Sequence, residues 1–466
     1  MACNINSYLR KGNSLENNIL RPYTYYISIF FLCCSVMVFG QRFTLPEGTK
    51  YEKVNFELIN NLIVIPLEIN EARLNFILDS GVSNPILFNL SDQDSIELKN
   101  VSEITINGLG AGEPLKALNS RGNSFRFKKI KNLDQQLFVV LDKDINFSPT
   151  LGIPIHGIIG FDLFRDFVVE INYGNQSIKF HDPRYYKSKP SKKVQTLPLS
   201  IVDRKAYVDG KVSFDEMEDV PVKLLVDTGS SDAVWLFQDL EKGINIPEDH
   251  YVDYLGKGLN GSIFGKRTKV SSITLGNYVL KDAKAAFPDM FSFSSIKDHG
   301  DRNGTVGGEI LRRFNIVFNY QGNEVSLSKN GHFKAPFTFN MSGLEIQHKG
   351  VRYIAERITD SRGVVKNDER SFGDVQILME NRTRLSIVPE IIVSAIRAGS
   401  PAEEAGLREG DVILAVNGKS IHKYKLQEIM QMINEKEGKK VRLLIERYKK
   451  DLVFSFTLKD VFKKKP

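Results

Sequence analysis

Two short stretches of the sequence carry the residues best suited to chemistry. FILDSGVSN covers residues 76–84, and LLVDTGSSD covers residues 224–232. Each runs through three apolar residues into an aspartate, then a hydroxyl residue, then a glycine. A buried strand would deliver each aspartate to a turn that the glycine permits, and the hydroxyl can fix that turn by bonding to the backbone. One copy predicts a buried aspartate, and two copies that face each other predict a pair of carboxyl groups.

Such a pair, formed by Asp79 and Asp227, could hydrolyse an amide bond. Two carboxyl groups about 3 Å apart share one proton, because both cannot be ionised. The ionised member can take a proton from water, and the protonated member can polarise the carbonyl group and later donate to the leaving nitrogen. This chemistry needs no metal, cofactor or thiol. The sequence predicts none, since its seven histidines are scattered without a ligand-type cluster.

The two stretches belong to a repeated unit of about 150 residues. Gly160 follows Asp79 by 81 residues, and Gly307 follows Asp227 by 80. An arginine, a phenylalanine and an Asn-Tyr pair then follow each glycine at equal distances. The alternative interpretation is a pair of structural turns, but unrelated turns are not expected to share so long a pattern. The repetition favours paired catalytic carboxyl groups.

The segments that must position these aspartates are predicted to form β-structure from about residue 51 to 330. Short runs rich in Val, Ile, Phe and Tyr alternate with Asn, Gly and Asp turn signals. A polar, lysine-rich stretch at 185–195 is expected to link the two halves. The clearest predicted strands are 62–69, 206–214, 315–320 and 324–328.

From about residue 335 the pattern changes to mixed helix and strand. In AGSPAEEAGLREGDVILAVNG, Ser400 is expected to cap a short helix with Glu403 completing a capping box. VILAV then predicts a strand that ends at an Asn-Gly turn. A second helix is expected in residues 423–438, where four apolar residues lie on one face: Leu426, Ile429, Met430 and Ile433.

The N-terminal 40 residues predict export. Basic residues precede ISIFFLCCSVMVFG (27–40), an apolar run whose length suits a signal peptide. Val38 and Gly40 are small enough for the −3 and −1 positions of a cleavage site, and an uncleaved anchor is the alternative. All three cysteines lie in this leader, so the mature chain is expected to have no disulfides.

Composition limits the remaining possibilities. A chain of 466 residues with 42% hydrophobic and 26% charged residues is expected to form several globular domains. The formal charge of +7 is spread along the chain, without a basic stripe interleaved with aromatics, so no nucleic-acid partner is predicted. GKGLNG (256–261) fits the dinucleotide fingerprint, but a strand-like segment follows it where a helix is required.

These motifs resemble the two lobes of an aspartic protease of the pepsin–retropepsin type. The whole chain is similar to bacterial exported aspartyl proteases with a C-terminal PDZ domain. The resemblance implies an all-β, bilobal fold of β-barrel lobes followed by an α+β PDZ domain, with Asp79 and Asp227 as the catalytic pair. It implies that residues 158–160 and 305–307 cross the two aspartate motifs. Ser80 and Thr228 would join the lobes by crossed hydroxyl-to-backbone bonds, and the supporting residues would be Ser80, Gly81, Thr228, Gly229, Ser230, Gly160 and Gly307.

One departure from the family pattern concerns the residue after each motif glycine. The family commonly has Ser or Thr there, whose hydroxyl bonds the catalytic carboxylate. Ser230 fits this pattern, whereas Val82 does not. Because an extra donor favours the ionised form, we expect Asp227 to be the charged member and Asp79 the protonated one.

Glycine-rich stretches at similar offsets in the two halves are candidate flaps. NGLGAGEP covers 107–114, and LGKGLNGS covers 255–262. The resemblance implies hairpins that close over a substrate from both sides, and ordinary glycine turns are the alternative. The candidate tip residues are Gly108, Gly110, Gly112, Gly256, Gly258 and Gly261.

The PDZ resemblance implies a loop that binds a ligand's terminal carboxylate through backbone N–H groups. The best match is Gly343, Leu344, Glu345 and Ile346. Because too many residues separate this loop from the rest of the PDZ-like segment, we expect an insertion around 351–386.

The sequence thus predicts a leader (1–40), two aspartic protease lobes (41–189 and 190–333) and a PDZ domain (334–466). The predicted function is an exported aspartic endopeptidase, periplasmic or at the cell surface, that acts as a monomer on peptides or proteins. The PDZ domain would recruit substrate C-termini, and membrane contact would occur only through an uncleaved leader. The alternative is a catalytically inactive peptide-binding or scaffold protein of the same fold.

Overall fold

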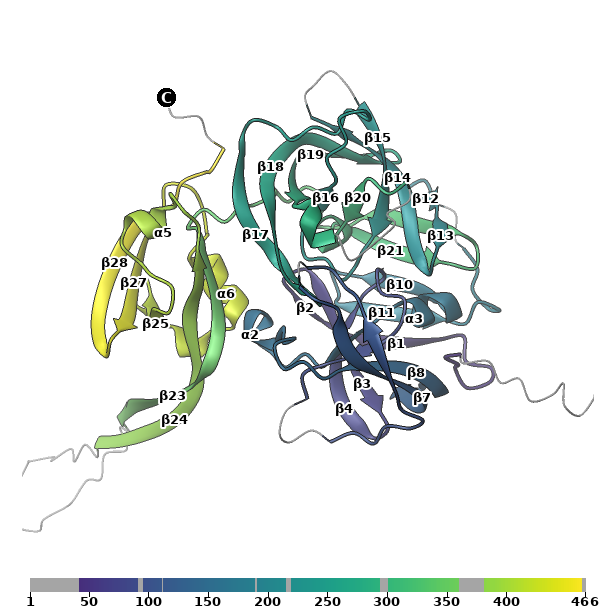
Figure 1. Cartoon of the computed structure of the whole chain (residues 1–466), viewed down its shortest axis with the longest axis horizontal. Coiled ribbons are helices and arrows are strands. Elements are labelled where there is room, and N and C mark those ends of the chain that lie inside the picture. The colour runs from purple at the N-terminus through teal and green to yellow at the C-terminus, as the bar shows by residue number, and fades with distance from the viewer. Residues whose placement is uncertain are drawn as a thin grey trace, which may run out of the picture. The chain divides into compact units, whose positions relative to one another are not determined.

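The computed structural model describes residues 42–90, 95–110, 112–188, 191–214, 219–293, 301–359 and 381–462 (Figure 1). The predicted leader at residues 1–40, with its three cysteines, lies outside the described residues. Within the described ranges the chain is mostly β-sheet with a few short helices. No helix among these residues combines enough length with enough apolar character to cross a membrane.

The first repeat (residues 41–189) contains an eight-stranded sheet in the order β2-β3-β4-β9-β5-β8-β7-β6. Because β3 also pairs with β7, the sheet folds back on itself. Its strands are β2 (Glu57–Ile59), β3 (Leu62–Ile69), β4 (Ala72–Leu78), β5 (Ile86–Leu87), β6 (Ser102–Ile106), β7 (Leu115–Phe127), β8 (Ile130–Val140) and β9 (Gly157–Ile159); the short helices α2 (Ser148–Leu151) and α3 (Phe161–Asp166) flank β9.

The second repeat (residues 190–333) has the same topology. Its eight-stranded sheet has the order β13-β14-β15-β20-β16-β19-β18-β17, and β14 also pairs with β18. Each strand thus has a counterpart in the first repeat at the same place in the sheet. The elements are β13 (Ser200–Val202), β14 (Lys205–Ser213), β15 (Asp219–Val226), β16 (Val234–Leu236), β17 (His250–Gly258), β18 (Gly261–Leu275), β19 (Tyr278–Pro288), η1 (Met290–Phe293), β20 (Gly304–Val306) and α4 (Gly308–Leu311).

A six-stranded sheet joins the two repeats in the order β1-β11-β10-β21-β22-β12. Its central pair, β10 and β21, is antiparallel and comes from different repeats, with Ile171 opposite Ile316. The rings of Phe164 and Phe318 lie 5.1 Å apart in an apolar core that both repeats share. The strands are β1 (Tyr51–Asn55), β10 (Val168–Asn172), β11 (Ser177–His181), β12 (Val194–Pro198), β21 (Phe314–Asn319) and β22 (Glu324–Lys329).

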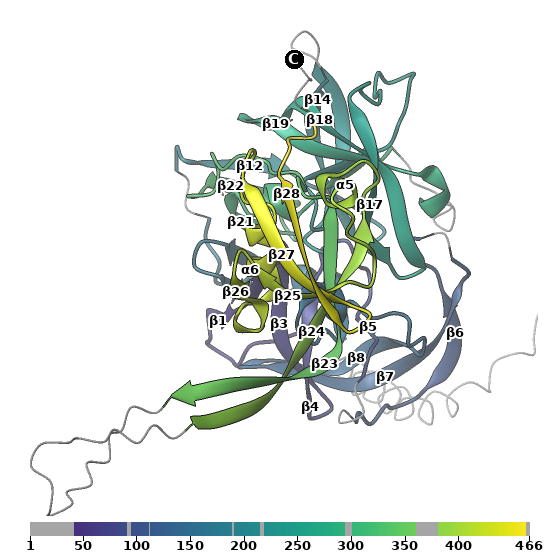
Figure 2. The same cartoon turned by 90° about the vertical axis from the view of Figure 1, so that its left-hand side faces the viewer.

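The C-terminal part forms a sheet of its own in the order β23-β24-β25-β27-β28, with β26 beside β25. It has a separate apolar core, in which Ile429 and Val441 are fully buried. Figure 2 shows β23 and β24 continuing together beyond the rest of this sheet. The predicted insertion at 351–386 begins and ends within their ladder, and residues 360–380 lie outside the described residues. The elements are β23 (Leu344–Thr359), β24 (Asn381–Ile396), α5 (Pro401–Glu404), β25 (Val412–Val416), β26 (Lys419–Ser420), η2 (Ile421–Lys423), α6 (Leu426–Met432), β27 (Lys440–Arg447) and β28 (Lys450–Thr457).

The strands expected from the sequence lie at or within one residue of their predicted bounds. The predicted strand at 62–69 is β3, and the predicted strand at 206–214 is β14, shifted by one residue. Two-residue turns with positive φ precede both, at residues 60–61 and 203–204, as tight hairpins require. The helix expected over 423–438 is shorter: η2 ends at Lys423, and α6 covers only Leu426–Met432.

Candidate active site

Asp79 and Asp227 follow directly after β4 and β15. In each repeat a second strand runs parallel to this one, β9 beside β4 and β20 beside β15. The Asp79 N–H donates to the carbonyl of Ile159 (2.8 Å), and the Asp227 N–H donates to that of Val306 (3.0 Å). A Cβ atom on Gly160 would lie 1.7 Å from the Asp79 carbonyl oxygen, so this crossing requires glycine.

The two aspartates lie close together, and each carboxyl group acts on the pKa of the other. The N–H of Gly81 donates to Asp79 Oδ1 (2.7 Å), and the N–H of Gly229 donates to Asp227 Oδ1 (2.8 Å). Each glycine also lies against the carboxyl group of the other repeat. A Cβ on Gly229 would be 2.2 Å from Asp79 Cγ, and one on Gly81 would be 3.1 Å from Asp227 Cγ. The glycines therefore allow the two carboxyl groups to approach.

Ser80 and Thr228 connect the repeats by four hydrogen bonds. Ser80 Oγ donates to the carbonyl of Val226 (2.7 Å) and accepts from the Thr228 N–H (3.0 Å). Thr228 Oγ1 donates to the carbonyl of Leu78 (2.7 Å) and accepts from the Ser80 N–H (3.0 Å). Both side chains are fully buried, at 0% exposure. Each hydroxyl thus satisfies a buried donor and a buried acceptor of the opposite motif, which fixes the aspartates relative to each other.

Burial and charge separate the two carboxyl groups. Burial raises the pKa of Asp79 well above its ordinary value, and the adjacent Asp227 carboxylate raises this pKa further. Burial also raises the pKa of Asp227, but the hydrogen bond from Asp79 and the cations Arg302 and Lys205 oppose that rise. These directions favour the proton on Asp79 and the charge on Asp227.

The expected cause of this asymmetry is wrong. Among the described residues, Ser230 Oγ makes no hydrogen bond to the Asp227 carboxylate. It lies instead beside Gly307, where an added Cβ would be 2.9 Å away. The charge on Asp227 is favoured by Arg302 and Lys205, two residues that the sequence reasoning did not single out.

The two candidate flaps meet at their tips. The loop 107–114 joins β6 to β7, and residues 259–260 form the turn between β17 and β18. Asn260 Oδ1 accepts from the Gly108 N–H (2.7 Å), and Asn260 Nδ2 donates to the carbonyl of Glu113 (2.9 Å). The Asn260 backbone also bonds to Leu109 and Gly112. One buried asparagine thus closes one flap against the other.

The flap glycines permit this contact. A Cβ on Gly258 would lie 2.1 Å from the Leu109 carbonyl oxygen, and one on Gly112 would lie 2.5 Å from the Asn260 oxygen. Gly110, Gly256 and Gly261 have φ of +123°, +150° and +110°, which side chains rarely adopt.

Each flap tip packs against the apolar cluster of the opposite repeat. Leu259 contacts the first-repeat cluster that contains Ile86 and Phe88. Leu109 contacts the second-repeat cluster that contains Trp235 and Phe293. This exchange could not be predicted from the sequence, because contacts across the repeats depend on the fold.

A network of ion pairs joins the second flap to the aspartate motif of the same repeat. Arg267 on β18 bonds both Asp232 (2.8 Å), which follows the aspartate motif, and Asp253 on β17 (2.8 Å). Although burial acts to raise it, the cations Arg267 and Lys284 hold the pKa of Asp232 at about 2. Trp235 Nε1 donates to the same carboxylate (2.7 Å).

The predicted carboxylate loop, residues 343–346, leads into β23. Its Gly343 N–H donates to Asn340 Oδ1 (2.9 Å), and its Leu344 N–H donates to Ser342 Oγ (3.2 Å). Burial, and then the charge of Asp253, raise the pKa of Glu345 to about 7. A ligand carboxylate at this loop would have to replace the bonds from Asn340 and Ser342.

Helix α6 and strand β23 also contact α2 within the chain. Gln427 Nε2 of α6 donates to the carbonyl of Leu151 in α2 (2.8 Å). A Cβ on Gly152, at the end of α2, would lie 3.0 Å from Leu426 Cβ and 3.6 Å from His348 Cε1.

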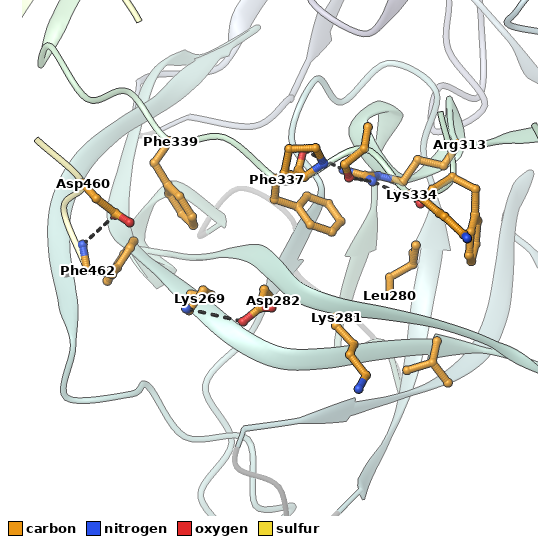
Figure 3. Close-up of a pocket in the computed structure, with 14 residues that line it drawn as sticks. Lys269, Leu280, Lys281, Asp282, Arg313, Lys334, Phe337, Phe339, Asp460 and Phe462 are labelled. Carbon is orange, nitrogen blue, oxygen red and sulfur yellow. Dashed lines mark hydrogen bonds and ion pairs between the residues drawn. The ribbon is translucent and has the colours of Figure 1, made fainter. Parts of the chain in front are cut away.

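A pocket of about 490 Å³ lies apart from the predicted site residues (Figure 3). Its walls include Lys269, Lys281 and Lys334, and Figure 3 shows Arg313 beside Phe337. The Arg313 guanidinium lies 3.7 Å from the Phe337 ring centroid and bonds the carbonyls of the segment after β22. Arg313 is therefore buried because it packs against the segment that leads to the C-terminal part.

Comparison with known proteins separates the chain into two matched regions. The family described as "Aspartyl protease" matches residues 65–163 and 209–310, which include both aspartate motifs. The family described as "PDZ domain" matches residues 392–447. The two segments of the first match follow the internal repeat.

Curated relatives match over the PDZ region alone. A "Probable CtpA-like serine protease" of Staphylococcus aureus (strain COL) is 45% identical over 58 residues, and the "Carboxy-terminal processing protease CtpA" of Bacillus subtilis (strain 168) is 46% identical over 57. Each match covers 12% of this chain and 12% of the relative's length. The chain therefore contains an aspartyl protease region in two repeated segments and, C-terminal to it, a PDZ domain.

Proposed function

We propose that this chain is an exported aspartic endopeptidase in which Asp79 and Asp227 activate a water molecule. The observation that carries the proposal is the buried carboxyl pair, fixed by the four hydrogen bonds of Ser80 and Thr228. Because one chain supplies both aspartates, the protein would act as a monomer.

The protonation states set the order of steps. A water molecule bound between the carboxyl groups would lose a proton to Asp227 as its oxygen attacks the peptide carbonyl carbon. Asp79 would give its proton to the carbonyl oxygen, which forms a neutral tetrahedral intermediate. When the C–N bond breaks, Asp227 would return the proton to the leaving nitrogen, and the intermediate's hydroxyl would return one to Asp79. The enzyme ends in its starting state.

The flaps would control access to this chemistry. A peptide that enters between the flaps and the aspartates would pair with the flap backbone as an added strand and exclude water. The bonds of Asn260 to Gly108 and Glu113 would have to open first. The PDZ domain would recruit protein C-termini.

Export is proposed from the leader. Residues 27–40 would direct secretion, and cleavage after Gly40 would release the mature chain. Fractionation of expressing cells and N-terminal sequencing of the protein test this directly. A cytoplasmic protein that keeps residues 1–40 would refute export without touching the catalytic proposal.

The test of catalysis is digestion of a mixed peptide library between pH 3 and 8, with products identified by mass spectrometry. Internal cleavage that is blocked by a peptide with a hydroxyethylene group in place of the scissile amide is the expected result, since that group mimics the tetrahedral intermediate. Tight binding of peptides without any cleavage would instead support the alternative, a peptide-binding scaffold.

A further inference from the structure

Lys205 lies near the two carboxyl groups. It is the first residue of β14, and the antiparallel register of β14 with β15 pairs Tyr207 with Leu225. Asp227 directly follows β15, so Lys205 and Asp227 each lie two residues beyond this pair, at the same end of the two paired strands. The charge of Lys205 acts on both carboxyl groups.

Leu62 holds the same place in the first repeat. β3 and β4 pair Val64 with Ile77, and Leu62 and Asp79 each lie two residues beyond that pair. The turns before Leu62 and Lys205 have matching backbones, with φ of 48° and 67° at residues 60–61 and 49° and 65° at residues 203–204. The two repeats thus place a buried leucine and a lysine at equivalent positions.

Contacts with the opposite repeat hold both turns in place. Asn61 Nδ2 donates to the carbonyl of Ser231 (2.7 Å). Arg204 donates to Asn84 Oδ1 (2.9 Å), and its guanidinium lies 5.6 Å from the Phe161 ring centroid. These contacts hold the turns before Leu62 and Lys205, and therefore also hold these two residues in place.

A second cation lies on the Lys205 side. Arg302 is five residues before Gly307, and the equivalent residue of the first repeat is Ile155, five before Gly160. Arg302 bonds the carbonyl of Gly304 (3.0 Å) and Thr305 Oγ1, and its charge acts on Asp227. Ile155 is fully buried in the same apolar cluster as Leu62.

The two repeats therefore differ in polarity at these positions. The first repeat has the buried apolar residues Leu62 and Ile155, whereas the second has the cations Lys205 and Arg302. Within the described part of the chain, no hydrogen bond or ion pair engages the Lys205 ammonium group. Burial, and then Arg302, lower the pKa of Lys205, so a further anion beside it would be stabilised. Asp203 also neighbours this group, and Tyr207 neighbours Arg302.

We propose that the Lys205 side of the site selects a carboxylate of the peptide substrate. This rests on the proposed endopeptidase function and names its substrate class. The carboxylate belongs either to an Asp or Glu side chain or to the substrate's C-terminal residue. Arg302 adds a second positive charge near Asp227.

The test compares cleavage of matched peptides by the full chain. One series places Glu, Gln or Leu at each position flanking a cleaved bond, and a second series has a free or an amidated C-terminus beside that bond. A preference in the first series identifies a side-chain carboxylate, and one in the second identifies a chain end. We expect kcat/KM for the carboxylate peptide to exceed that for its neutral match by about ten- to a hundredfold, the range for hydrogen bonds between charged groups.

Variants assign that preference to Lys205. Lys205→Leu, which copies the first repeat, and Lys205→Gln, which keeps a polar side chain, should each reduce the ratio to within about threefold of unity. Lys211→Leu is the control, because Lys211 lies on the same strand with its side chain 56% exposed. Fluorescence of Trp235 checks that each variant is folded.

The outcomes separate the two proposals. Cleavage without a preference in either series, or a preference that survives both Lys205 substitutions, would overturn the carboxylate selection and leave the endopeptidase function standing. Failure of the wild type to cleave any peptide would overturn the endopeptidase function and the selection that rests on it.

Discussion

Replacing Thr228 by Val tests the contact that fixes the two aspartates. The substitution keeps the branched shape of the side chain and removes one hydroxyl. It leaves the Leu78 carbonyl without its 2.7 Å donor and the Ser80 N–H without its 3.0 Å acceptor. Both groups are buried, and each unpaired buried group costs about 1–3 kcal/mol. We therefore expect a loss of about 2–6 kcal/mol in the free energy of unfolding.

The assay is urea unfolding followed by tryptophan fluorescence. Trp235 is the single tryptophan of the chain and is buried on β16, so its emission reports on the second repeat. With a urea dependence of about 3 kcal/mol/M, the midpoint should fall by roughly 0.7–2 M. Thr105→Val on exposed β6 is the control and should change stability by less than about 0.5 kcal/mol. Equal midpoints for the two variants would refute the argument that the crossed hydrogen bonds stabilise the pair.

Three further substitutions test the carboxyl contact, the flaps and the PDZ loop. Gly229→Ala places a Cβ 2.2 Å from Asp79 Cγ and should lower kcat by roughly a hundredfold. Gly331→Ala is the control, because the space around Gly331 is open and kcat should stay unchanged. Equal rates for the two variants would contradict the close approach of Gly229 to Asp79. Asn260→Ala removes the side-chain bonds to Gly108, Gly112 and Glu113, so it should speed amide hydrogen exchange of residues 107–114 by about tenfold or more. Unchanged exchange would contradict the closure. Because the pKa of Glu345 is raised to about 7, its ionisation destabilises the fold increasingly from about pH 4.5 to 7. Glu345→Gln should therefore raise the Tm at pH 8 and leave it nearly unchanged at pH 4.5, and an equal effect at both pH values would exclude that cause.

The sequence predicted the parts of the site that recur in both halves of the chain. The repeated Asp-hydroxyl-Gly motifs and the later apolar-Gly segments indicated an equivalent pair of aspartates, and the structure brings the two motifs together. The strand bounds were predictable because alternating burial leaves a period of two in the sequence. The leader stays a prediction, since residues 1–40 lie outside the described part of the chain.

The features that differ between the repeats could not be predicted from single motifs. The structure replaces the expected Ser230 donor by Lys205 and Arg302, which lie 22 residues before and 75 residues after Asp227. The fold brings both residues near the carboxyl pair, and neither position has a local signal in the sequence. Aligning the repeats through their glycines would have pointed to Arg302, because Ile155 is its apolar equivalent. The interlocking of Asn260 with the first flap depends on packing across the repeats, which leaves no local signal.

The most direct test of the central claim is the rate of peptide hydrolysis by the wild type, Asp79→Asn and Asp227→Asn under identical conditions. Both substitutions keep the size of the side chain and remove its capacity to exchange a proton. If the two carboxyl groups activate water together, either substitution should lower kcat by about 10²–10⁴-fold, while Trp235 fluorescence stays unchanged. Hydrolysis that persists at the wild-type rate in either variant would contradict an aspartic mechanism.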